Sequence, residues 1–117
     1  KAQVYILHVV ADRIGHTIDD YGLTPRSIKQ MEAKMIKGAR NKLQKQIDKF
    51  PQTNTLEVFS EVVIGNPSEI ILNTQKDKKI DLIVISSLGK TGLAQYFLGS
   101  VVRNVLKGST CSVLLTK

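Results

Sequence analysis

Cysteine and histidine are scarce in this chain of 117 residues. The one cysteine, Cys111, excludes an internal disulfide, and together with two histidines it gives no spacing typical of a zinc site. Long hydrophobic runs are lacking too, because apolar stretches such as residues 62–64 and 82–85 fall far short of the ~20 residues that a membrane span needs. The N-terminus does not have the pattern of a signal peptide. We therefore expect a cytoplasmic protein.

Acidic residues are outnumbered, with 10 Asp and Glu against 17 Lys and Arg and a net charge of +7. The excess is concentrated in residues 26–49, where eight basic residues face only Glu32 and Asp48. A solvated helix face accounts for such a stretch. Nucleic-acid binding usually adds interleaved aromatic residues, and Phe50 is the only one nearby. An RNA- or lipid-binding surface stays open as a weaker alternative, and we expect no nucleic-acid partner.

The remaining composition is that of a folded chain. Hydrophobic residues make up 42% and charged residues 23%, close to average globular usage. A chain of this length fits one domain, residues 1–117.

Apolar strands alternate with helical patterns along the sequence. Residues 3–10 and 81–85 predict strands buried on both faces, and residues 56–64 and 112–116 predict two more strands. A long helix begins at Pro25 behind a Thr24 cap, a second begins at Pro67, and a third begins near Ser100 with Gly108 as its C-terminal cap. The long helix has one apolar stripe, formed by Ile28, Met31, Met35, Ala39, Leu43 and Ile47. This order predicts an α/β fold, an open parallel Rossmann-like sheet with helices on both faces.

The loop at residues 86–100 is the most informative segment, because it leads from a buried strand to a helix N-terminus. Gly89 and Gly92 would let backbone N–H groups approach a phosphate, and Gly99 and Ser100 would add the positive helix end. It is not a P-loop, because the first glycine of that motif would fall at Val84. Glycines that serve only turns and close packing are the alternative.

The segments ILHVV (6–10), VIGNPSEII (63–71), DLIVIS (81–86), LGSVVRNVL (98–106) and CSVLL (111–115) resemble the universal stress protein family across nearly the whole chain. ATP-binding members have a glycine, two residues, a second glycine, nine residues and then Gly-Ser. Here Gly89 and Gly99-Ser100 match the later elements, and Ser86 replaces the first glycine. The family has an adenine nucleotide alpha hydrolase-like fold.

The resemblance implies a non-catalytic stress-response module that binds ATP, with or without Mg²⁺. By matching positions, Val9 would line the adenine pocket and Gly65 would lie near the ribose. The phosphate-binding positions would be Ser86, Gly89, Gly99, Ser100 and Val101. If the Cβ of Ser86 abolished binding there would be no cofactor, and the alternative is a nucleotide-free homodimer that pairs through residues 112–116.

The resemblance also implies a strand and helix before residue 3, with that strand at the centre of the sheet. Without it the sheet would be split, and we expect this unit to be absent from the given sequence or supplied by another chain. No Ser/His/Asp arrangement is supported by the sequence, and we expect His8 to be packed within its strand.

Overall fold

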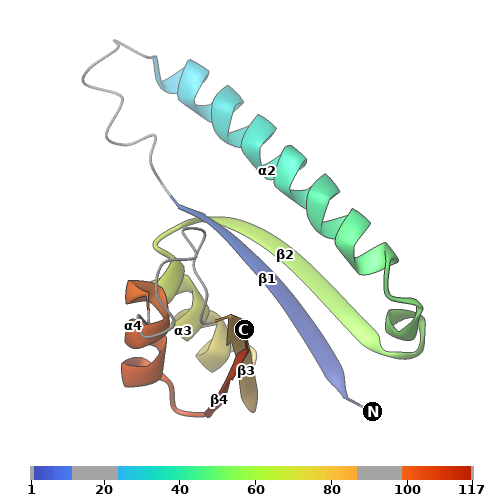
Figure 1. Ribbon diagram of the computed structural model, residues 1–117. Helices are drawn as coiled ribbons and strands as arrows, with labels where there is room; N and C mark the ends of the chain where they lie inside the picture. Colours follow the sequence, from blue (N-terminus) through green and yellow to red (C-terminus); the bar gives the residue numbers. More distant parts are fainter. Residues whose placement is uncertain (1, 12–23, 87–98, 117) are drawn as a thin grey trace. The chain divides into compact units, whose positions relative to one another are not determined.

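The protein folds into two compact units, Lys1–Asn66 and Pro67–Lys117. The structure is a computed structural model, and it describes residues 2–11, 24–86 and 99–116. Each unit combines two parallel strands with α-helix (Figure 1). The α/β class with parallel strands is therefore confirmed, and the expected split is seen in the described residues as two separate two-stranded sheets.

The first unit contains strands β1 (Gln3–Ala11) and β2 (Glu57–Gly65), the helix α2 (Pro25–Asp48) between them in sequence, and the short 3-10 helix η1 (Pro51–Thr55). The strands pair in parallel from Gln3 opposite Glu57 to Ala11 opposite Gly65. Tyr5 and Phe59 are opposite each other, and their rings stack with centroids 5.0 Å apart. Val62 is the buried centre of this unit.

Helix α2 begins as the sequence predicts. The Thr24 hydroxyl accepts a hydrogen bond from the Ser27 N–H at 3.2 Å, and Pro25 occupies the first helical position. The apolar stripe of α2 is only partly buried, because no residue of α2 is fully buried and Met31 is 42% exposed. The helix therefore covers its strands without a sealed interface.

The second unit consists of α3 (Pro67–Asp77), β3 (Leu82–Ser86), α4 (Ser100–Gly108) and β4 (Ser112–Thr116). Strands β3 and β4 pair in parallel, with Leu82 opposite Ser112 and Ser86 opposite Thr116. Val102 and Val105 of α4 are buried. Two successive β-strands joined through a helix in this way form the βαβ unit that the sequence pattern indicates.

The end of α3 is shaped by a left-handed residue. Lys79 has φ 52°, and the Ile80 N–H donates to the Gln75 carbonyl at 2.9 Å while the Lys79 N–H donates to the Lys76 carbonyl at 3.3 Å. This pair of bonds is the Schellman arrangement, in which glycine usually occupies the left-handed position. A lysine there carries backbone strain.

Four expectations about burial and capping are wrong. Strand β1 is not buried on both faces, because each of its residues is half-buried or exposed. Strand β3 is not buried on both faces: Leu82 and Val84 are 49% and 60% exposed, because the described helices of its unit cover only one side. In β1, His8 is exposed rather than packed within the strand. Gly108 is the last residue of α4 and does not cap it, since Ser109 is the C-cap and donates its N–H to the Val105 carbonyl.

Candidate functional site

The carboxyl ends of β1 and β2 bring two of the predicted site residues together. Gly65 ends β2 opposite Ala11, and Val9 lies two residues before Ala11 on the same face of β1. His8 and Val10 face α2, since they line a groove beneath that helix. Val9 and Gly65 therefore share the sheet face that points away from α2, and Val9 is half-buried there.

The second unit holds the remaining described positions of the predicted site. Ser86 is the exposed last residue of β3, and Gly99 is the N-cap of α4. Ser100 begins the helix and is exposed, while Val101 is half-buried. Gly89 and Gly92 fall outside the described residues, so the predictions made for them are not tested. Each half of the site is described within its own unit.

The N-terminus of α4 has the chemistry of an anion site. Gly99 makes no side-chain cap, and its carbonyl accepts the first intrahelical bond, from the Arg103 N–H at 3.1 Å. The N–H groups of the first turn have no partner within a helix, and the helix dipole places partial positive charge beside them. The Ser100 hydroxyl adds one more donor at the same point.

Gly99 and Gly108 differ in what their missing side chains leave room for. A Cβ on Gly108 would lie 2.6 Å from Leu72 Cδ1, so the end of the Leu72 side chain would have to move to admit one. Among the residues that the structure describes, none lies within 4 Å of the place where a Cβ on Gly99 would be, and its φ of −61° suits any residue. Contact with Leu72 therefore accounts for a small residue at Gly108, whereas no described neighbour accounts for the glycine at position 99.

The described residues offer neither a cluster of metal ligands nor a membrane-spanning helix. Residues 2–11, 24–86 and 99–116 contain no cluster of three His, Cys, Asp or Glu side chains that could hold a metal ion. None of the helices described is long and apolar enough to cross a membrane.

The model of the universal stress protein family matches residues 1–117. The chain belongs to this family. Among curated relatives, universal stress protein MJ0577 of Methanocaldococcus jannaschii is 32% identical over 125 residues, which cover 98% of this chain and 76% of that protein. Universal stress protein MJ0531 of the same organism is 30% identical over 116 residues, covering 99% of this chain. The chain spans 65% of MJ0531, slightly less than two thirds of its length.

Solved structures agree with this assignment. The structure of MJ0577 superposes with a TM-score of 0.79 at 32% identity, covering 100% of this chain and 77% of that one. A universal stress protein solved in complex with cAMP gives a TM-score of 0.54 at 19% identity, covering 98% of this chain and 73% of that one. The first likeness supports both family and fold, and the second supports the fold alone.

Sequence reasoning located the strand ends and the helix N-terminus but missed two contacts that hold the second unit together. These are the approach of Gly108 to Leu72 and the hydrogen bonds between Gln75 and Thr110. The glycine at the end of α4 was the available signal for the first contact. The second contact had no signal, because nothing in the sequence ties a glutamine to a threonine so far along the chain.

Proposed function

We propose that this chain is a regulatory stress-response module that binds an adenine nucleotide, ATP, and catalyses no reaction. The observation that carries the proposal is Gly99, which is the N-cap of α4 and has no described residue within 4 Å of the place where a Cβ would lie. Residues 1–117 act as one domain in this proposal, because the family model matches across both units. We place the protein in the cytoplasm.

Each half of the site has a separate task. The first-turn N–H groups of α4, with Gly99, Ser100 and Val101, hold the phosphates, and Gly89 continues the same cradle. At the ends of β1 and β2, Val9 offers an apolar surface to adenine, and Gly65 leaves room for the ribose. Mg²⁺, when it accompanies the triphosphate, is bound by phosphate oxygens and reduces their repulsion.

Ser86 is the position that decides how tightly a nucleotide binds. A serine keeps the backbone N–H that glycine would offer, but its Cβ projects at the end of β3 where the family has glycine. One relative of the same fold was solved with cAMP, which also carries an adenine base and a phosphate. That supports an adenine nucleotide as the ligand class, with ATP as the specific choice for this chain.

Titration calorimetry with ATP tests the proposal, using a matched pair of glycine variants. Gly99→Val places a branched side chain where the phosphates would lie. Gly38→Val is the control: it introduces the same side chain in α2, outside the proposed site, where no described residue lies within 4 Å of the new Cβ. We expect the parent and Gly38→Val to bind ATP and Gly99→Val to lose binding. Absence of heat for the parent with ATP and with cAMP would overturn the proposal.

A second candidate function is that of a nucleotide-free homodimer formed through β4. In the described residues β4 has β3 as its one paired neighbour, and it exposes Leu114 by 52% and Leu115 by 38%. An unprotected apolar edge strand favours pairing with a second copy. Light scattering on the parent and on Leu114→Lys distinguishes the outcomes: a dimer that Leu114→Lys dissociates supports this candidate, and a monomeric parent excludes it.

A further inference from the structure

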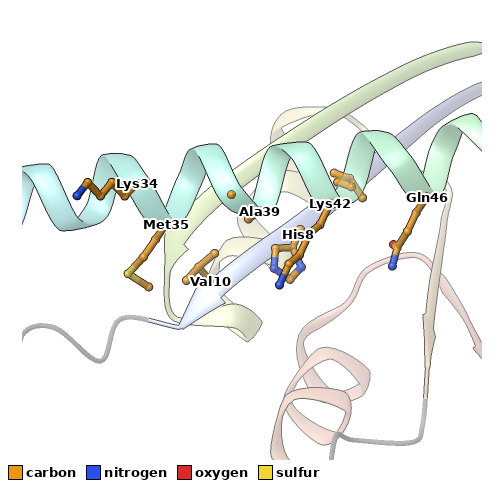
Figure 2. Close-up of a pocket in the computed structure, with 9 residues that line it drawn as sticks. His8, Val10, Lys34, Met35, Ala39, Lys42 and Gln46 are labelled. Atoms are coloured by element: carbon orange, nitrogen blue, oxygen red, sulfur yellow. The ribbon is translucent and has the colours of Figure 1, made fainter.

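Beneath α2 a groove runs along β1 within the first unit, on the face opposite Val9 (Figure 2). It encloses about 380 Å³, and we call it the β1 groove. His8 and Val10 contribute from the strand, and residues 34–46 contribute from the helix. Twelve residues of α-helix advance about 18 Å, so the groove is elongated along the helix axis. An elongated open groove suits an extended or helical partner better than a compact small molecule.

The described lining of the β1 groove combines apolar and basic side chains. Val10, Met35 and Leu43 provide apolar surface, and Figure 2 shows Met35 extending from α2 toward the side on which Val10 lies. Among the described residues of the lining, Lys34 and Lys42 carry charge and none is acidic. The described part of the groove therefore presents apolar surface together with positive charge.

The opposite side of α2 provides an internal comparison. A smaller groove of about 290 Å³ lies between α2 and β2, and there Arg40 shares the lining with Glu61. Arg40 thus has an acidic counterpart within the same lining, whereas the described lining of the β1 groove offers none to Lys34 and Lys42. Of the two grooves beside α2, the β1 groove is therefore the one whose described lining suits an acidic partner.

We propose that the β1 groove is an interaction surface for an acidic amphipathic helix. Apolar side chains spaced at i, i+3/i+4 and i+7 would contact Val10, Met35 and Leu43, and carboxylates beside that stripe would meet Lys34 and Lys42. Burial of this surface would also complete the cover of α2, which has no buried residue of its own. The proposal does not depend on nucleotide binding, because Val9 and Gly65 lie on the other face of the β1–β2 sheet.

The test uses a fluorescein-labelled peptide of about 18 residues, long enough to form a helix, with Leu on one face and Glu on both sides of that face. A second peptide has Lys in place of every Glu. Fluorescence anisotropy with the full chain measures affinity, and circular dichroism measures the helix gained on binding. We expect the acidic peptide to bind and to gain helicity, and the basic peptide to bind at least about tenfold more weakly.

Matched charge-reversal variants locate the surface. Lys34→Glu/Lys42→Glu changes the groove, whereas Lys37→Glu/Lys45→Glu changes the same helix by the same charge at positions that do not line it. All four lysines are exposed, so both variants should fold, which thermal melts verify. We expect the first variant to lose about tenfold or more in affinity for the acidic peptide and the second to lose about threefold or less.

Three results would overturn the proposal. The acidic peptide could fail to bind, the two double variants could weaken binding equally, or the basic peptide could bind as well as the acidic one. A membrane surface is the competing occupant. If the protein instead sedimented with vesicles of phosphatidylcholine and phosphatidylserine, and both variants reduced that binding alike, α2 would be a lipid-binding helix and the groove assignment would be wrong.

Discussion

Gln75 of α3 and Thr110, which precedes β4, are joined by three hydrogen bonds across 35 positions of sequence. The Gln75 amide donates to the Thr110 hydroxyl at 2.9 Å. Its carbonyl oxygen accepts from that hydroxyl at 3.2 Å and from the Thr110 N–H at 3.4 Å. Gln75 is only 6% exposed. A buried amide satisfied in this way fixes the approach of α3 to the start of β4.

Removal of the Gln75 side chain should therefore destabilise the second unit. Gln75→Ala leaves the Thr110 N–H without this acceptor and opens a small space, and we expect a loss of about 1–3 kcal/mol in unfolding free energy. Urea denaturation followed by circular dichroism measures it. Thr110→Val and the double variant complete a thermodynamic cycle, and effects that simply add would show that the two side chains are not coupled.

Gly108 and Gly38 should respond in opposite directions to alanine. Gly108→Ala places a Cβ 2.6 Å from Leu72 Cδ1, so the Leu72 side chain must repack between α3 and α4, which we expect to cost about 1 kcal/mol. Gly38→Ala meets nothing within 4 Å in the middle of α2, and its better helix propensity should add up to about 1 kcal/mol. Thermal melts of both variants test this contrast.

Shortening the facing side chain provides the control for Gly108. In a Leu72→Ala background the overlap at Cδ1 is gone, so Gly108→Ala should lose most of its penalty. A penalty of unchanged size in that background would show that backbone conformation, and not the contact with Leu72, requires the glycine.

The left-handed position after α3 offers a stabilising change. Lys79 has φ 52°, and glycine adopts this conformation without the Cβ clash that costs about 1–2 kcal/mol. Lys79→Gly should raise the unfolding free energy by about 1 kcal/mol, reduced slightly by loss of a cation near the helix end. Urea denaturation measures the change, with Lys78→Gly as the control at the preceding position. A melt in which both variants lose stability would contradict this account.

Local signals in the sequence determined most of the elements. Thr24 and Pro25 mark the start of α2 exactly where the structure has it, and β3 was expected at residues 81–85 and lies at Leu82–Ser86. These features depend on neighbours along the chain, so local pattern suffices. Which face of a strand is buried depends on what packs against it. The hydrophobic pattern of residues 81–85 therefore could not predict that Val84 is exposed.

The candidate site divides in the same way. Gly99 could be predicted as the start of a helix because a glycine before a helical pattern is a local signal, and its role in phosphate binding stays a prediction. The basic groove was not recognisable, because it combines His8 with Lys42 across a helix–strand contact that only the fold creates. Long-range juxtapositions of this kind account for what sequence reasoning missed in this protein.

The last prediction concerns Ser86, where this chain departs from the ATP-binding pattern of its family. If its Cβ limits how closely the phosphates approach, Ser86→Gly should tighten ATP binding about tenfold, which corresponds to about 1.4 kcal/mol.

Ser112→Gly is a matched control, because Ser112 lies at the far end of the same strand pair, opposite Leu82. Both variants remove one serine Cβ from a strand and carry a similar backbone cost. Titration calorimetry should then show tighter binding for Ser86→Gly alone. Equal affinities for the two variants and the parent would mean that the serine leaves the nucleotide's approach unhindered, and the reason for its presence would lie in the strand itself.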